Sequence, residues 1–323
     1  MTDALKSTET DQSPRSGTPV SVSKAPEGGD ASEARSLASD AWRELRRRPL
    51  FWISLGIIAL FVLMAIVPQL FTRLDPTAAS LSRGSDPPEF TWDGAWFGYD
   101  LQGYDIYART IYGARASILV GVFATILTSL IGVVIGTISA FYGGWLDSLM
   151  MRLTDIFFAI PFLLGGILFM TTFANDENSG YFLIVGKVVL VLAILGWPSI
   201  ARLMRGSVLQ VKPNEYVQAA RALGASPWRV IRSHILPNAM APVLIVSMIN
   251  LGAYISAEAS LSFLGIGLTP PAISWGVAIS DSLTYIETAP HMLIFPSIFL
   301  SLTVLGFIML GDVVRDAFDP KTR

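Results

Sequence analysis

The chain has 323 residues, of which 52% are hydrophobic and only 15% are charged, and its mean hydropathy is +0.54. Soluble globular proteins carry about 25% charged residues, so this composition is typical of an integral membrane protein. The net charge of −2 gives no basic footprint for nucleic acid. The chain has no cysteine and only two histidines, which excludes disulfides, thiolate metal sites, cysteine nucleophiles and histidine-rich metal sites.

The N-terminal region differs in composition from the rest of the chain. Residues 1–38 are rich in Ser, Thr, Glu, Asp, Gly and Pro, and the first aromatic residue is Trp42. Such a segment buries too little apolar surface to fold, so we expect a disordered cytoplasmic tail. Residues 39–49 contain an arginine cluster and predict a short basic helix at the membrane interface, with Trp42 and Leu45 facing lipid.

Residues 50–323 are predicted to form an all-α membrane domain with six transmembrane helices. A helical span needs about 20 apolar residues. Pro161 and Pro198 predict kinks in the third and fourth spans. The six expected spans are 50–71, 116–142, 154–173, 183–204, 239–264 and 291–311.

The positions of Lys and Arg predict the orientation in the membrane. Basic residues cluster before the first span, between spans four and five, and after the last span, whereas loops 174–182 and 265–290 contain none. Cytoplasmic loops carry the excess of positive charge, so both termini are predicted to lie in the cytoplasm.

The sequence offers no catalytic constellation. It has no Gly-x4-Gly-Lys-Ser/Thr phosphate loop, no His-Glu-x-x-His and no Gly-x-Ser-x-Gly, so the chain is not predicted to be an enzyme. Glu258 is the one acidic residue well inside a predicted span. It could serve as an ion-coupling site, because intramembrane charge is costly and often functional, or it could form structural hydrogen bonds.

The loop between spans four and five, residues 205–238, is long for a helix connection. Asn214 can cap a first short helix that runs through Leu223, and Gly224 follows as a left-handed stop residue. Ser226 and Pro227 then predict the cap and first position of a second short helix, which Pro237 would end.

The first of these helices is thin, because it contains Ala219, Ala220 and Ala222, with Glu215 and Arg221 at its edge. A thin helix on the cytoplasmic surface allows another protein to approach closely. This favours docking of a soluble partner, and the alternative is a helix that packs only on its own spans.

This loop resembles the EAA loop of ABC importer permeases, whose pattern is Glu-Ala-Ala-x3-Gly-x9-Ile-x-Leu-Pro. Gln218-Ala219-Ala220, Gly224 and Leu236-Pro237 match it, while Gln218 replaces the glutamate and His234 stands at the isoleucine position. His-Ile-Leu-Pro-Asn is familiar from the dipeptide, oligopeptide and nickel branch of these importers.

Further segments resemble the C-type permease subunit of that branch, and the resemblance covers about residues 40–323. They are 98–117, Asp147-x3-Met151-Arg152-x2-Asp155, 258–267, Pro270-Pro271-x2-Ser274-Trp275-Gly276 and 310–320.

The resemblance implies one of the two membrane subunits of a bacterial ABC importer for di- or oligopeptides in the cytoplasmic membrane. It implies a B-type permease partner, two ATPase subunits and an extracytoplasmic substrate-binding protein, with ATP and Mg bound only by the ATPases. The alternatives are a nickel importer, or a self-contained secondary transporter or channel that uses Glu258. The residues implied in ATPase coupling are Glu215, Gln218, Ala219, Ala220, Arg221, Gly224, Ser226, Pro227, His234, Leu236 and Pro237.

Overall fold

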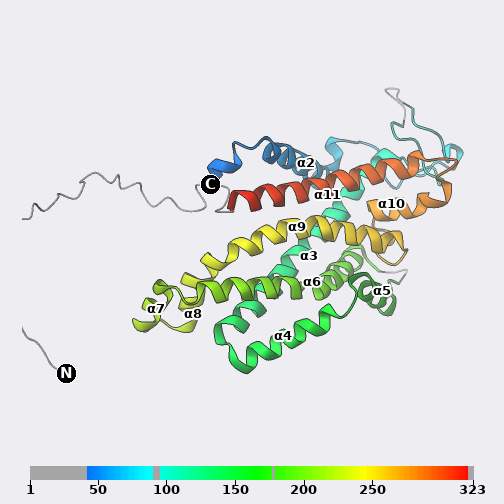
Figure 1. Cartoon of the computed structure of the whole chain (residues 1–323). Coiled ribbons are helices and arrows are strands. Elements are labelled where there is room, and N and C mark those ends of the chain that lie inside the picture. The colour runs from blue at the N-terminus through cyan, green and yellow to red at the C-terminus, as the bar shows by residue number, and fades with distance from the viewer. Residues whose placement is uncertain (1–41, 90–94, 177–178, 319–323) are drawn as a thin grey trace, which may run out of the picture. The chain divides into compact units, whose positions relative to one another are not determined.

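The computed structural model describes residues 42–89, 95–176 and 179–318, and the expected disordered tail lies outside them. Apart from two isolated β-bridges, the regular structure of these residues is helical, as predicted. Figure 1 shows the arrangement of the helices. They are α2 (Pro49–Ile66), α3 (Ile106–Tyr142), α4 (Gly144–Phe158), α5 (Phe162–Thr172), α6 (Tyr181–Val211), α7 (Glu215–Ala222), α8 (Pro227–Val230), α9 (Leu236–Phe263), α10 (Trp275–Ser282) and α11 (His291–Phe318), with short 3₁₀ turns at Pro68–Leu70, Leu81–Arg83 and Leu283–Tyr285 and a π turn at Ile231–Ile235.

The structure contains the six predicted membrane spans only if α4 and α5 are counted together as one broken span. In the described part of the chain, five helices are long and apolar enough to cross a membrane, and α4 and α5 together pass the same test but meet at 82°. The predicted kink at Pro161 in the third span is confirmed and is sharp enough to break the helix, and the first part of this span begins at Gly144, ten residues before the predicted start at 154. Pro161 lacks a backbone N–H and its ring clashes with the preceding helical turn, so the helix stops before it and restarts after it.

Other helices are longer than the predicted spans, among them α3, α6 and α11, which continues seven residues past the predicted end at 311, to Phe318. α3 begins at Ile106, ten residues earlier than expected, because the Asp105 carboxylate caps it by accepting from the Ala108 N–H at 2.7 Å. α6 continues seven residues past the predicted end at 204, to Val211. Pro198 lies inside α6 and does not end it. Hydropathy marks the segment that crosses lipid, and it misses these polar extensions.

Two glycines allow α3 and α6 to pack closely. Gly132 and Gly136 lie one turn apart on α3, and both face α6. A Cβ on Gly132 would lie 2.6 Å from the Ile200 Cβ and 3.0 Å from the Ala201 backbone nitrogen, closer than packed atoms come. Small residues at this spacing let two helix backbones approach closely. The resulting van der Waals contacts hold the helices together in lipid, where the hydrophobic effect does not.

The basic segment before α2 is partly tied to the C-terminal end of the chain. Trp42 is exposed, as predicted, but Leu45 is buried against Val313, Val314 and Ala317 of α11, so the prediction that it faces lipid is wrong. The Arg48 guanidinium also bonds Asp316 at 3.0 Å. The partner of Leu45 is more than 260 residues away, and the local pattern cannot reveal it.

We predict that Gly132→Val destabilises the protein by about 1–3 kcal/mol, because the new side chain overlaps the α6 backbone. Gly186→Val is the matched control: Gly186 lies on α6, and a Cβ there meets no atom within 4 Å. Thermal unfolding of the purified protein in detergent measures the difference. Equal shifts for the two variants would show that the close packing of α3 and α6 contributes nothing.

Candidate functional site: the 212–237 segment

The segment between α6 and α9 is shorter and more helical than the loop predicted over 205–238. α6 reaches Val211, α7 follows at Glu215–Ala222, and α8 at Pro227–Val230 continues through the π turn into α9. The prediction that Pro237 ends a helix is wrong, because Pro237 lies in the first turn of α9. The wider π turn before it leaves room for a proline ring, which an α-helical turn does not.

The turn after α7 has the predicted geometry. Gly224 adopts a positive φ of 81°, and the Ala225 N–H donates to the Ala220 carbonyl at 3.0 Å. This bond closes the helix end in the way that a glycine in the left-handed region permits. A Cβ on Gly224 would meet no atom within 4 Å, so backbone conformation is what favours glycine here.

One of the two predicted caps is present. The Ser226 hydroxyl accepts from the Arg229 N–H at 3.4 Å, and Pro227 occupies the first position of α8. Asn214 stands at the start of α7, but its side chain makes no cap and instead donates to the Tyr216 hydroxyl at 3.2 Å. The first turn of α7 therefore keeps its amide groups free of a side-chain cap.

The segment is fastened to the end of α3. The Lys212 ammonium donates to the carbonyls of Ala140 at 3.0 Å and Phe141 at 2.8 Å, where it complements the negative end of the α3 dipole. The Arg221 guanidinium lies 5.0 Å from the centre of the Phe141 ring. Val217 is buried in the core cluster beneath α7. A displacement of α7 must therefore move this end of α3 or break these contacts.

Most residues implicated by the EAA-like pattern lie on the open surface of the segment. The exposed ones are Glu215, Gln218, Ala219, Arg221, Gly224, Ser226, Pro227 and Pro237. Ala220, His234 and Leu236 are half-buried, and the His234 ring lies 6.4 Å from that of Tyr216.

Two apolar side chains that the sequence analysis did not single out project from this surface. Leu223 is 89% exposed and Trp228 is 67% exposed, on either side of the Gly224 turn. Apolar residues next to a stop glycine and after a helix-starting proline were the available signal. Large side chains left open beside a well-packed turn are typical of a protein contact.

Glu258 lies elsewhere, in α9, and is fully buried. The hydroxyls of Ser117 and Ser262 each donate to its carboxylate at 2.8 Å, and the Leu268 N–H donates to the Ser262 hydroxyl at 2.9 Å. These bonds join α3 and α9 to the segment that leads to α10. The arrangement supports the structural interpretation of Glu258, because each of its two oxygens accepts a hydrogen bond from a serine hydroxyl.

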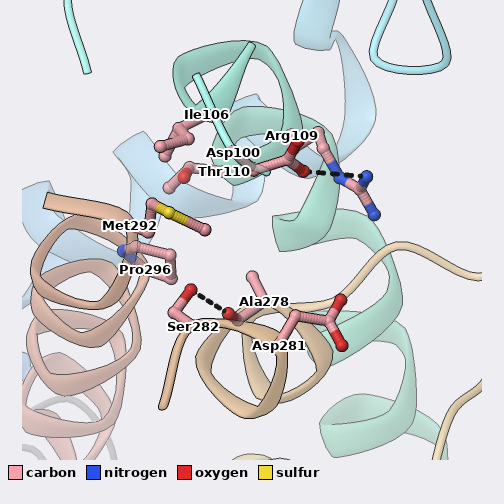
Figure 2. Close-up of a pocket in the computed structure, with 9 residues that line it drawn as sticks. All are labelled: Asp100, Ile106, Arg109, Thr110, Ala278, Asp281, Ser282, Met292 and Pro296. Carbon is pink, nitrogen blue, oxygen red and sulfur yellow. Dashed lines mark hydrogen bonds and ion pairs between the residues drawn. The ribbon is translucent and has the colours of Figure 1, made fainter. Parts of the chain in front are cut away.

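A small pocket lies at the other end of α3, about 55 Å from Tyr142 at 1.5 Å per helical residue. Figure 2 shows Arg109 paired with Asp100, at 3.3 Å, across the pocket from Asp281 on α10. Burial raises the pKa of Asp281, although the nearby Arg109 opposes the shift. The pocket has a volume of about 30 Å³. Among the described residues no three acidic or histidine side chains gather into a metal site.

Comparison with known families agrees with this geometry. Residues 132–323 match the family described as binding-protein-dependent transport system inner membrane component, and residues 36–88 match the N-terminal TM domain of oligopeptide transport permease C.

Named relatives match over nearly the whole chain. The chain is 42% identical to the oligopeptide transport system permease protein OppC of Bacillus subtilis (strain 168), over 93% of this chain and 96% of that protein. It is 38% identical to the dipeptide transport system permease protein DppC of the same organism, over 89% and 87%. The glutathione transport system permease protein GsiD of Pectobacterium atrosepticum is 36% identical, over 87% and 92%.

The fold also resembles that of a solved transporter. A chain of the MetNI methionine ABC transporter, in an inward-facing conformation, superposes with a TM-score of 0.52 at 20% identity, over 65% of this chain and 96% of that chain. One conclusion follows from the apolar helices, from the exposed turn between α6 and α9, and from these matches. The chain belongs to the inner-membrane permease components of binding-protein-dependent ABC transport systems.

Proposed function

We propose that this chain forms half of the translocation path of a peptide importer and that α7, the Gly224 turn and α8 dock an ATPase subunit. The exposed Leu223 and Trp228, held beside a turn that is fastened to α3, carry this proposal. Burying an exposed apolar side chain contributes about 1.5–3 kcal/mol, which is enough to anchor a contact between subunits.

Peptides are the substrate class that the relatives favour. The three relatives described above are named for oligopeptides, dipeptides and glutathione, which share a peptide backbone. Membership of the family implies the other subunits of the transporter. They are a B-type permease subunit, two ATPase subunits that bind ATP and Mg, and an extracytoplasmic substrate-binding protein.

The proposed orientation places α7 and α8 in the bacterial cytoplasm with both termini. The segment from 205 to 238 carries five Arg and Lys residues, whereas loop 265–290 carries none. This charge asymmetry supports the orientation. α10 and the small Asp100–Arg109 pocket would then face outward, on the side where a binding protein delivers substrate.

In the proposed mechanism, closure of the ATPases displaces the docked turn, and the displacement passes into the helices through Lys212 and Arg221. The carbonyls that Lys212 caps belong to α3, which packs against α2, α6, α9 and α11. The transporter would alternate between inward-open and outward-open states whose populations ATP and the loaded binding protein shift.

We predict that Leu223→Asp weakens ATPase docking by about tenfold or more, because a carboxylate replaces an apolar contact worth about 1.5–3 kcal/mol. Leu81→Asp is the matched control, since Leu81 is 82% exposed and lies in the loop at the opposite end of α3. Co-purification of the ATPase subunits with each variant gives the measurement. Undiminished docking of Leu223→Asp would exclude this surface as the contact.

Gly224→Val should abolish ATPase docking while membrane insertion and pairing with the second permease subunit persist. A β-branched residue at a φ of 81° costs about 1–2 kcal/mol of strain, or the turn rearranges. Gly224→Asn should retain most docking, because Asn tolerates the left-handed region. ATP turnover in nanodiscs reports the outcome. If valine and asparagine behave alike, the conformation of the turn does not matter.

Single cysteines test the orientation, since the chain has none of its own. Glu287→Cys, exposed between α10 and α11, should react with a membrane-impermeant maleimide in intact cells. Ser233→Cys, exposed in the π turn, should react only after permeabilisation. The reverse pattern would place the docking surface outside the cell.

A further inference from the structure

A cavity of about 580 Å³ opens where α4 and α5 break, and it is walled by α6 and α9 as well. We call it the break cavity. It is far larger than the pocket of Figure 2 and lies in a different part of the helix bundle. Its lining includes Pro161, Ser199, Asn250, Ser256 and Ser260.

The break cavity lies near the middle of two helices that could span the membrane. Asn250 stands near the middle of α9, and Ser199 stands near the middle of α6. Both helices are long and apolar enough to cross the bilayer. Polar groups at this depth face hydrocarbon unless protein or water covers them.

Several polar groups in the cavity keep free hydrogen-bonding capacity. The Ser199 and Ser260 hydroxyls each donate to a carbonyl of their own helix, at 2.9 and 2.8 Å, which leaves their oxygen lone pairs free. The Asn250 amide and the Ser256 hydroxyl, both half-buried, bond no other side chain or backbone group in the described part of the chain. The Asn250 amide and the Ser256 hydroxyl therefore need water or a polar ligand, and the Ser199 and Ser260 oxygens can accept a hydrogen bond from one.

The break between α4 and α5 lies beside the same cavity, since Pro161 and Phe162 line it. α4 ends at Phe158 and α5 begins at Phe162, with an 82° bend between them. The first amides of α5 have no carbonyl one turn earlier to bond, because Pro161 and the bend interrupt the ladder. At membrane depth such irregular backbone persists only where it is buried in protein or lines a water-filled cavity. Interrupted helices of this kind hold the substrate sites of other transporters.

We propose that the break cavity is this chain's contact surface for the passing peptide, an inference that rests on the proposed function. Among the residues that the structure describes, no Asp, Glu, Lys, Arg or His lines it. Hydroxyl and amide groups pair with the peptide backbone, which every substrate shares, and the aromatic wall of Phe157, Phe158, Phe162 and Tyr254 tolerates varied side chains. The lining is therefore selective for uncharged amide groups and indifferent to the side-chain sequence.

Cysteine accessibility tests whether water fills the cavity. Asn250→Cys and Ser256→Cys, in the assembled transporter in nanodiscs, should react with a cationic methanethiosulfonate in the nucleotide-free or the vanadate-trapped state. Leu244→Cys is the matched control, because Leu244 lies on α9 and is exposed on another face. It should react at least about tenfold more slowly, since a thiol in lipid stays protonated and one pKa unit is a tenfold change in thiolate.

A charge placed in the cavity tests contact with the peptide. Asn250→Asp should lower the transport ratio of Ala-Glu-Ala to Ala-Lys-Ala by about tenfold, through repulsion and attraction at low dielectric. Asn238→Asp makes the same change at the exposed end of α9 and should leave the ratio unchanged.

Two results would overturn the proposal. One is an Asn250→Cys thiol that is unreactive in every state, which would show that water does not reach this face. The other is an unchanged transport ratio in Asn250→Asp. If the wild-type complex does not transport peptides, the proposed function is refuted instead. The cysteine-labelling experiment would still report whether the cavity holds water.

Discussion

A polar group inside a bilayer must find its partner in the protein or in trapped water, because hydrocarbon offers no hydrogen bonds. This constraint explains where the chain departs from plain apolar helices. Glu258 is surrounded by donors from Ser117 and Ser262, so it can stay buried between α3 and α9. The break around Pro161 cannot be satisfied within its own helix and opens a cavity instead.

The long helix α3 connects the two ends of the helical domain. α3 extends from the capping Asp105 to Tyr142, so one rigid element reaches from the Asp100–Arg109 pocket to the docking turn. At the docking end, Arg205 forms a bidentate ion pair with Asp147 at 2.7 and 2.6 Å, and this pair holds the start of α4 against α6. Bidentate pairs fix geometry as well as distance. In the proposed mechanism, a push at α7 would therefore reach both α3 and the helix that ends at the break.

The sequence predicted several features whose causes are local, although the expected cap by Asn214 is absent. The positive φ of Gly224 and the cap by Ser226 follow from residues within a few positions, and the structure has both. The family was also recognisable, because the EAA-like pattern is a contiguous run. The burial of Leu45 depends on α11, which lies far away in the sequence. The exposure of Leu223 depends on no other segment covering it. A local sequence pattern contains neither kind of information. The continuity of α8 with α9 depends on a π turn that has no sequence signature.

Cross-linking in the assembled transporter tests the central claim most directly. A single cysteine at Ala222, exposed at the end of α7, would carry a short heterobifunctional photo-cross-linker in native membranes. Mass spectrometry of the products then identifies the neighbouring chain. The account predicts cross-links to an ATPase subunit, at a yield that changes between the nucleotide-free and ATP-bound states. Cross-links confined to this chain or to the binding protein would contradict it.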